Sequence, residues 1–466
     1  MGRTVVINPV TRIEGHAKID IEIDDADQVV GARLHVLEFR GFEKFIEGMQ
    51  VELMPTLTTR ICGTCPHAHH LVAAKCVDLI FGANPPRAAL LQRQLLNAGS
   101  IIHSHAIHFF ALAGPDLLLG LGAAPADRNI VSLLKAAPDL AKKALRLRSL
   151  GQKIAEIVGG RGTHPVTAVA GGMAAVINGD KLNQLRTMAN EALELSKFAL
   201  DAGKKVLNDR AELIELLPLP SYDLGTVQNG VWDLYDGLLR LTAPDGKTAA
   251  EVPASKYKDV MVEEATTYSY SKRVLFKLAG SEVEYRVGPL ARLNACTKLP
   301  TPGAQAELEE YRSRFGHPTP QVVLNHYARL IELLACAELA VEICNDPELT
   351  SDNVLTKPTH GPKPGIAHVE APRGVLIHDY DVDDKGLIRK ANFLVATQHN
   401  VSSIDKSLRT AAEHFWKKPE AEFVNGVEFA IRCYDPCLSC STHQVGQMPM
   451  VVNVLRRGQL VRQVRR

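Results

Sequence analysis

Alternating apolar and polar residues predict β-structure near both ends of the chain. From His16 to Asp24, an alanine and three isoleucines alternate with lysine, aspartate and glutamate. This alternation predicts a half-buried strand, because successive side chains of a strand point to opposite faces. A turn at residues 24–27 and a returning strand over residues 29–39 complete the first predicted hairpin. A second hairpin is predicted over residues 375–382 and 387–396, closed by Asp383-Asp384-Lys385-Gly386.

The middle of the chain follows the period of a helix. Asn84-Pro85-Pro86 predicts a helix start, since proline is tolerated in the first turn, and apolar residues then recur every three or four positions. A second helix is expected from Asp180, as its N-cap, and a third after Thr319-Pro320 as far as Cys344. Apolar stripes of this length are typical of a helix bundle. Shorter β-like stretches are expected at residues 231–241 and 283–287.

These patterns predict an α+β fold, mostly α. We expect a central bundle of long helices, with small β-hairpins at the N-terminus and in the C-terminal half. The length of 466 residues corresponds to about three units of ordinary size. We divide the chain into a β-rich segment (1–60), a helical core with a β insertion near 220–290 (61–350), a β/α segment (351–443) and a C-terminal extension (444–466).

The composition excludes several classes of protein. Hydrophobic residues make up 46% and charged residues 23%, which excludes a mainly disordered chain. Lys+Arg 53 against Asp+Glu 52 gives a net charge of +1, so no nucleic-acid partner is expected. The sequence predicts no membrane span, which needs about 20 apolar residues, and no secretory signal, so we expect a cytoplasmic protein. Five arginines and no acid lie in residues 444–466.

Two C-x-x-C pairs carry the candidate chemistry. The odd total of nine cysteines argues against a disulfide framework and favours reduced thiols. The pairs are Cys62/Cys65 and Cys437/Cys440, and four thiolates suit a soft metal. A zinc ribbon usually separates its pairs by about 12–20 residues, far fewer than separate these two. A shared tertiary metal site is therefore favoured, with structural zinc or two separate redox dithiols as the alternatives. The other five cysteines are expected to be small buried hydrophobic residues: Cys76, Cys296, Cys336, Cys344 and Cys433.

Seven motifs occur in a recognisable order. They are NPVTRIEGH (8–16), RGFE (40–43), RICGTCPHAH (60–69), GGRGTHP (159–165), VGPLARLN (287–294), EAPRG (370–374) and DPCLSCSTH (435–443). Together they resemble the large subunit of a [NiFe] hydrogenase, over nearly the whole chain. The sequence is most similar to the cytoplasmic, multimeric, bidirectional branch of that family. In His103-Ser104-His105 a serine stands where uptake-type relatives usually carry an aspartate. The resemblance implies that dihydrogen is coupled to NAD(P), a deazaflavin, ferredoxin or a heterodisulfide.

The resemblance also implies the ligands of two metal sites. Cys62 and Cys437 match the terminal thiolates of nickel. Cys65 and Cys440 match the thiolates that bridge nickel to an iron carrying one CO and two cyanides. The ligands that match a magnesium site are the side chain of Glu43, the carbonyl of Phe393 and the side chain of His443. Carboxylate and carbonyl oxygens are ligands that magnesium prefers.

Four further residues are expected beside the nickel and iron. By resemblance, Arg373 lies over the open coordination position, Thr397 hydrogen-bonds a cyanide and Glu14 is the proton gate. His69 is expected to donate a hydrogen bond to a cysteine sulfur rather than to bind metal. Two bases compete for the proton, a terminal thiolate and Arg373. A metal lowers the pKa of a thiol from about 8.5, so a terminal thiolate can gain and lose a proton near neutral pH, whereas arginine is held charged by a pKa above about 12. We therefore expect Cys437 to be the first proton acceptor, with Arg373 as electrostatic support.

The resemblance implies partners as well. The chain has no further run of cysteines for an iron–sulfur cluster, so electrons are expected to leave through a cluster-bearing small subunit, followed by further electron-transfer subunits. A nickel-dependent endopeptidase is expected to cut after His443 and to remove residues 444–466. The alternative functions are a dihydrogen sensor and a non-catalytic metal-binding subunit of a redox complex.

Overall fold

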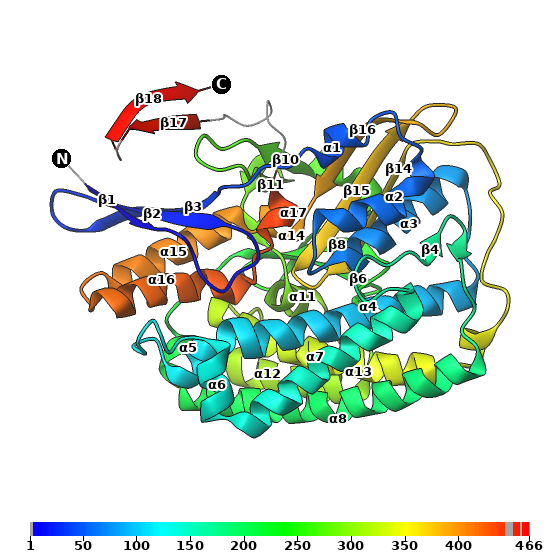
Figure 1. Cartoon of the computed structure of the whole chain (residues 1–466), viewed down its shortest axis with the longest axis horizontal. Helices are drawn as coiled ribbons and strands as arrows, with labels where there is room; N and C mark the ends of the chain where they lie inside the picture. The colour runs from blue at the N-terminus through cyan, green and yellow to red at the C-terminus, as the bar shows by residue number, and fades with distance from the viewer. Residues whose placement is uncertain (1–2, 443–450, 457–458, 466) are drawn as a thin grey trace.

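Four long helices form the base of the molecule (Figure 1). The structure is a computed structural model that describes residues 3–442, 451–456 and 459–465. The helices are α4 (Arg87–Ile107), α7 (Pro138–Gly159), α8 (Gly179–Asp209) and α13 (Asn325–Asn345). Helix α4 packs against α7 and α13, and α8 packs against the same two helices. Gly151 on α7 permits close packing, because a Cβ there would lie 2.5 Å from the backbone nitrogen of His103.

The helix starts agree with the sequence in part. Helix α4 begins directly after Pro86, as predicted. The N-cap of α8 is Asn178 and not Asp180, because the extended backbone of Asn178 lets its side chain accept a hydrogen bond from the Lys181 amide. Asp180 lies within the first turn instead. The third helix begins later than Thr319-Pro320, with the 3-10 turn η5 (Val322–Leu324) preceding α13.

The first predicted hairpin is confirmed and belongs to a three-stranded sheet. Strands β2 (Ala17–Ile23) and β3 (Val29–Val36) pair in antiparallel register, and β1 (Arg3–Ile7) adds to the free edge of β2. Buried and half-buried residues alternate along β2, as its sequence predicts. Strand β3 ends before residue 39. The sheet packs on α15 (Val401–Phe415).

The second predicted hairpin is also confirmed. Strands β15 (Gly374–Val382) and β16 (Ile388–Leu394) pair in antiparallel register, and β14 (Gly365–Ala371) completes a three-stranded sheet. This sheet lies against α3 (Pro66–Phe81). Every residue of β15 except Asp381 is buried, which places His378, Asp379 and Tyr380 inside the protein.

The β insertion differs in detail from its prediction. The stretch 231–241 is not one strand but two, β7 (Val231–Trp232) and β8 (Leu238–Thr242), because the chain turns between them at Gly237, whose φ is +135°. Residues 283–287 are likewise divided between β12 (Ser281–Val283) and β13 (Tyr285–Arg286). The other strands of this region are β6 (Tyr222–Gln228), β9 (Thr248–Val252), β10 (Met261–Glu264) and β11 (Arg273–Leu278).

Shorter elements complete the chain. The remaining α-helices are α1 (Phe42–Phe45), α2 (Met54–Leu57), α5 (Gly114–Leu119), α6 (Ile130–Ala136), α9 (Ala211–Ile214), α10 (Tyr257–Val260), α11 (Pro289–Ala295), α12 (Pro302–Phe315), α14 (Ala396–His399), α16 (Glu420–Tyr434) and α17 (Leu438–Ser441). The other turns are η1 (Val51–Leu53), η2 (Thr58–Ile61), the π-helical η3 (His108–Ala113), η4 (Ala254–Lys256) and η6 (Pro347–Thr350). The remaining strands are β4 (Ala168–Val169), β5 (Gly172–Met173), β17 (Val451–Arg456) and β18 (Gln459–Arg465).

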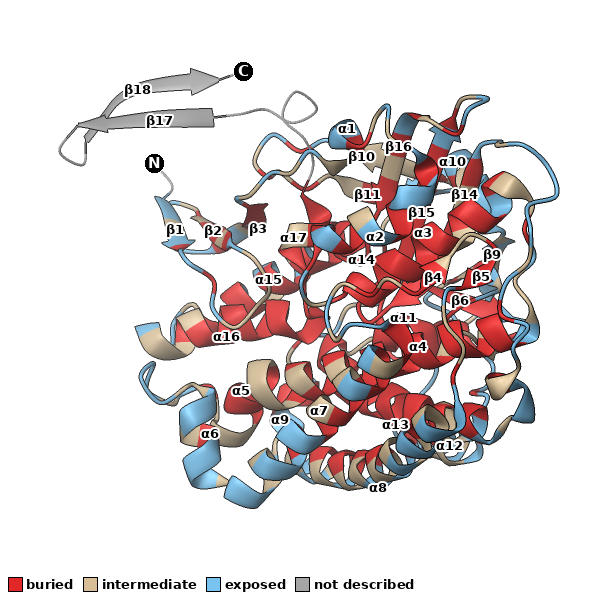
Figure 2. Cartoon of the chain, turned by 45° about the vertical axis from the view of Figure 1, so that its right-hand side comes forward, coloured by how far each residue is buried: buried red, intermediate tan, exposed pale blue. Residues whose placement is uncertain are grey.

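The architecture confirms the α+β, mostly α class. Buried residues fill the interior between the helix bundle and the β14–β16 sheet (Figure 2). Within the described ranges, no helix has both the length and the apolar character that crossing a membrane requires. The division of the chain into four segments stays a prediction.

Candidate metal centre

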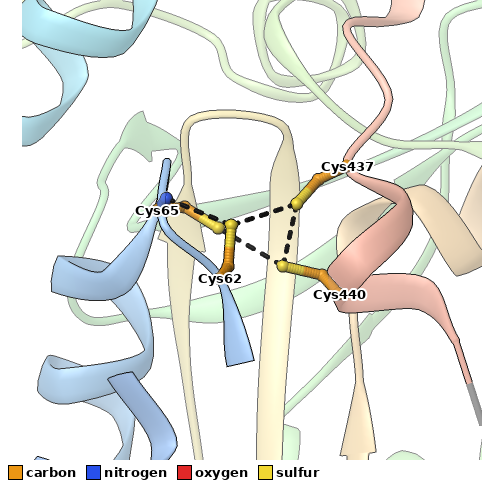
Figure 3. Close-up of side chains that lie close together, drawn as sticks. All are labelled: Cys62, Cys65, Cys437 and Cys440. Atoms are coloured by element: carbon orange, nitrogen blue, oxygen red, sulfur yellow. Dashed lines mark hydrogen bonds between the residues drawn. The ribbon is translucent and has the colours of Figure 1, made fainter. Parts of the chain in front are cut away.

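The fold brings the two cysteine pairs together. Cys62 follows η2 and Cys65 precedes α3, while Cys437 and Cys440 lie at the start and within α17. Figure 3 shows the four side chains converging from these two segments. Their Sγ atoms all lie within 4.8 Å of one another, and each residue is at most 4% exposed. The shared tertiary site is the arrangement that the sequence favoured.

The spacing of the sulfurs fits a metal. Sγ of Cys62 lies 3.3 Å from Sγ of Cys437, and Sγ of Cys65 lies 3.4 Å from Sγ of Cys440. The four residues are free cysteines without a disulfide. Four buried thiols at this distance form a donor set for a soft cation, and both nickel and iron accept such ligands.

Charge also favours a cation between the sulfurs. Hydrogen bonds from the thiols of Cys437 and Cys440 lower the pKa of Cys62 well below its usual value. Burial raises the pKa values of Cys437 and Cys440 well above theirs. The protein alone therefore favours the thiolate of Cys62, whereas ionising Cys437 and Cys440 requires a positive charge nearby to replace the lost water.

Arg373 supplies one positive charge beside the cysteines. It lines a small cavity together with Cys65, Cys437 and Thr397. Its Nη2 donates a 3.1 Å hydrogen bond to Oδ1 of Asp435, and both residues are buried. Its Nε and Nη1 have no hydrogen-bond partner among the described residues, which leaves two donors for a ligand. Burial alone would lower the pKa of Arg373, but Asp435 and the cysteine sulfurs raise it above its usual value.

Glu14 lies against the second cysteine pair. Its backbone forms a parallel bridge with Cys437, and the Leu438 amide donates to its carbonyl at 3.2 Å. The carboxylate accepts hydrogen bonds from the Ser439 amide at 3.1 Å and the Ser439 hydroxyl at 2.5 Å. Glu14 is half-buried, so its carboxylate stands between the buried site and the surface.

A buried ionic network positions the loop that carries Glu14. The Thr11 amide donates to Glu428 on α16 at 2.7 Å, and Arg432 on the same helix donates to the Thr11 hydroxyl at 3.0 Å. Arg12 and Arg432 both donate to Asp116, whose side chain has no exposed surface. Since α16 leads directly into the second cysteine pair, these contacts set Glu14 against Cys437.

Thr397 also contacts the second pair. Its Oγ1 accepts a 2.8 Å hydrogen bond from the Cys437 amide. The hydroxyl proton is then free to be donated to another group. The residue is 2% exposed and lines the same cavity as Arg373.

His69 lies on the other side of the sulfurs. Its Nε2 lies 3.5 Å from Sγ of Cys440, and its Nδ1 lies 3.1 Å from Nε2 of His378. Burial lowers the pKa of His69 to about 4, so the ring is neutral near pH 7. Both ring nitrogens of His69 thus have a neighbour, and one of these neighbours is a cysteine sulfur. The role of His69 as a hydrogen-bond donor to that sulfur stays a prediction.

The expected magnesium ligands are placed only in part. Glu43 on α1 is buried beside Arg40, and its Oε1 has no hydrogen-bond partner among the described residues. Phe393 lies on β16, an element that packs against α1. His443 lies outside the described residues. Oε1 of Glu43 lies 3.4 Å from Nη1 of Arg40 but accepts no hydrogen bond from the described residues, so it can still face a cation. The assignment of all three ligands stays a prediction.

The sequence did not predict the contacts that three residues make near the centre. Asp435 pairs with Arg373, Ser439 binds Glu14, and Arg40 donates a 2.6 Å hydrogen bond from Nη2 to the carbonyl of Cys440. All three lie within motifs that the sequence singled out, but the motifs do not reveal which side chains meet. The five cysteines outside the centre are buried, as expected: Cys76, Cys296, Cys336, Cys344 and Cys433.

Comparison with protein families covers most of the chain. Residues 40–142 and 232–443 match the family model described as nickel-dependent hydrogenase, and residues 4–39 match a model described as HoxL-like. The chain is 39% identical to one of the subunits of the F420-non-reducing hydrogenase vhc of Methanococcus voltae, over 98% of each chain. It is 37% identical to the NAD-reducing hydrogenase HoxS subunit beta of Cupriavidus necator, over 97% of each chain.

Solved structures support the same relationship. The structure aligns with an NAD⁺-reducing [NiFe]-hydrogenase in the H₂-reduced state with a TM-score of 0.91 and 37% identity, over 95% of this chain and 99% of the other. A Ni-Fe-Se hydrogenase from D. vulgaris Hildenborough shares the fold, with a TM-score of 0.78 and 23% identity over 95% of this chain and all of the other. The chain therefore belongs to the nickel-dependent hydrogenase family, as a large subunit of the nickel-iron type.

Proposed function

We propose that this chain performs the reversible heterolytic cleavage of dihydrogen at a nickel–iron centre held by its four cysteines. The observation that carries the proposal is the convergence of four buried sulfurs within 4.8 Å, beside a buried arginine with two free donors. The centre would consist of nickel with Cys62 and Cys437 as terminal ligands, and iron bridged through Cys65 and Cys440. When bound, this centre polarises dihydrogen and stores the electron pair.

The protein's own residues take up the proton. A metal-bound thiolate has a lowered pKa, so the sulfur of Cys437 is the proposed first acceptor. Glu14 follows, because its backbone pairs with Cys437 and its half-buried carboxylate leads toward the surface. Arg373 keeps its charge, since Asp435 raises its pKa, and acts through hydrogen bonds and charge rather than as a base.

Residues around the cysteines are proposed to bind a cyanide on the iron and a nearby magnesium ion. We propose that the Thr397 hydroxyl donates to a cyanide on the iron, because its oxygen already accepts from the Cys437 amide. Glu43, the carbonyl of Phe393 and His443 are the proposed magnesium ligands. The buried Oε1 of Glu43, which accepts no hydrogen bond from the described residues, supports the first of these.

Electron transfer needs a partner. Relatives of this chain are named as F420-non-reducing and NAD-reducing hydrogenase subunits. We propose that electrons pass to an iron–sulfur small subunit and then to further electron-transfer subunits. The final acceptor is a soluble one: NAD(P), ferredoxin, a deazaflavin or a heterodisulfide. We place the complex in the cytoplasm. We also propose that a maturation endopeptidase removes the residues after His443.

Metal analysis tests the proposal directly. The large subunit, purified anaerobically from a host with the maturation machinery and separated from its iron–sulfur partner, is expected to contain one nickel and one iron per chain, with infrared bands of CO and cyanide. The variant Cys65→Ser should lose the nickel and the bands, because Cys65 is a proposed ligand of both metals. Cys296→Ser is the matched control, because Cys296 is buried away from the cluster and should keep both. Zinc alone in the wild-type protein would contradict the proposal.

A further inference from the structure

A line of hydrogen-bonding groups runs from Cys440 into the protein core. Sγ of Cys440 lies 3.5 Å from Nε2 of His69, and Nδ1 of His69 lies 3.1 Å from Nε2 of His378. Nδ1 of His378 then lies 2.9 Å from the hydroxyl of Tyr380. The three residues after the cysteine are at most 1% exposed. Each atom in the series therefore depends on its neighbour, because water cannot replace it.

The fold fixes this alignment. His378 and Tyr380 are two residues apart on β15, so their side chains lie on the same face of the strand, which packs against α3. His69 projects from α3. The ring of Phe393 on the neighbouring strand β16 lies 4.2 Å from the His378 ring and 5.8 Å from the Tyr380 ring. The imidazole of His378 is thus held between its two hydrogen-bond partners.

The direction of donation follows from the state of the sulfur. A metal-bound thiolate carries no proton and can only accept, so Nε2 of His69 must be the protonated nitrogen. Nδ1 of His69 then accepts from Nε2–H of His378, because a neutral imidazole has one donor and one acceptor. Nδ1 of His378 must in turn accept from the hydroxyl of Tyr380. Every donor in the series points toward Cys440.

We propose that Tyr380 is a positioning residue for the metal centre, which sets the tautomers of His378 and His69 and thereby secures the hydrogen bond to the sulfur of Cys440. This inference rests on the proposed function, since it requires a metal-bound thiolate. Tyr380 touches neither the sulfur nor the reacting atoms, and it acts only through the two histidines. The tautomer of a metal-site imidazole is generally set by the group on its far nitrogen, and here that relation extends over two rings.

The series affects the electron density at the sulfur. A hydrogen bond withdraws charge from a thiolate and weakens its donation to a metal, and bonds linked in series strengthen one another. Without the tyrosine hydroxyl, Nδ1 of His378 loses its donor. The Nε2–H of His378 is then less polarised and becomes a weaker donor to Nδ1 of His69, because bonds in series strengthen one another. The hydrogen bond at Cys440 weakens, and the sulfur becomes a stronger donor.

The variant Tyr380→Phe tests the proposal by infrared spectroscopy of the matured holoenzyme. We expect its CO stretching band to move to lower wavenumber, because a more electron-rich metal donates more charge to CO. The matched control is Tyr285→Phe. The hydroxyl of Tyr285 also lies 2.5 Å from Nδ1 of a buried histidine, His399, but Nε2 of His399 has no hydrogen-bond partner among the described residues. The control should leave the band in place.

An unshifted CO band in Tyr380→Phe would overturn this inference and leave the proposed function intact. Absence of CO and cyanide bands from the wild-type enzyme would overturn the proposed function itself. If Tyr380→Phe fails to mature, neutron diffraction from the wild-type holoenzyme decides. Deuterium on Nε2 of both His69 and His378 and on the Tyr380 hydroxyl supports the inference. Deuterium on Nδ1 of either histidine overturns it.

Discussion

Arg373 is a cation buried beside four cysteines, and such a charge is costly unless it is paired. Asp435 provides the partner from the end of α16, where the chain adopts a left-handed conformation with a φ of 54°. Glu14 is fixed in a comparable way by the amide and hydroxyl of Ser439. At the scale of single residues, each proposed functional group is therefore oriented by a specific neighbour.

Glu14→Gln is the prediction at this scale. Glutamine keeps the size of the side chain and an oxygen that accepts from the Ser439 amide, but it cannot carry a proton at neutral pH. We expect hydrogen oxidation to fall by about 10²–10⁴-fold, the range for a lost general base, while nickel content stays unchanged. The assay is hydrogen-dependent reduction of an artificial acceptor, with nickel measured on the same sample.

The control for this variant is Glu38→Gln. The side chain of Glu38 is 41% exposed and contacts His16, close to Glu14 in the sequence, so its replacement should leave the activity unchanged. Full activity in Glu14→Gln would exclude Glu14 from the proton route.

Close packing between elements sets the shape of the centre. The loop before β2 approaches α17 so tightly that a Cβ on Gly15 would lie 2.7 Å from Cβ of Leu438. Gly15 also has a φ of +84°, a backbone conformation that other residues adopt only with strain. The position of Cys437 thus depends on a glycine far away in the sequence.

We therefore expect Gly15→Ala to displace the start of α17 and to reduce metal loading. The added methyl group meets Leu438, directly beside Cys437, in an already strained backbone. Nickel per chain after maturation is the quantity to measure. Gly41→Ala is the control, since no heavy atom lies within 4 Å of the added Cβ and its φ is −127°. Equal nickel in the two variants would contradict the prediction.

The sequence predicted elements better than contacts between them. Alternation along β2 and the helix start at Pro86 are local signals, and the structure confirms both. The pairing of Arg373 with Asp435 and the line from Cys440 to Tyr380 were not predicted, because they join segments that meet only after folding. Asn178 rather than Asp180 caps α8 because the backbone is extended at Asn178, which the sequence does not reveal when two polar residues lie close together.

The whole molecule holds two remote segments in contact. The β14–β16 sheet packs against α3, which follows the first cysteine pair, while α16 and α17 carry the second.

The large buried interior also contains several histidines in their neutral form. Burial lowers the pKa of His70 to about 4 and that of His368 to about 3.

These histidines predict acid sensitivity. Their pKa values are lower in the folded protein than the usual 6.5, so the stability they contribute is present above about pH 6.5 and is lost as the pH falls toward 4. Each buried histidine steepens the decline of the free energy of unfolding by up to about 1.4 kcal/mol per pH unit. Thermal unfolding midpoints between pH 7 and pH 4 measure this decline.

A variant of one histidine isolates its contribution. His70→Gln should flatten the decline, whereas His360→Gln, at an exposed position, should leave it unchanged. An identical pH dependence in wild type and His70→Gln would show that buried histidines do not govern acid unfolding.

The C-terminal extension gives a second prediction for the whole chain. If a maturation endopeptidase acts after His443, active enzyme lacks residues 444–466, including their five arginines. The intact mass of the active large subunit is then that of residues 1–443. Active protein with the mass of the full chain would contradict this.

Anomalous diffraction at the nickel and iron absorption edges tests the central claim most directly. Crystals of the matured enzyme are expected to show one nickel peak and one iron peak among the Sγ atoms of Cys62, Cys65, Cys437 and Cys440, with the nickel nearer Cys62 and Cys437. A lone zinc peak among these sulfurs, or nickel and iron bound elsewhere in the chain, would contradict the account.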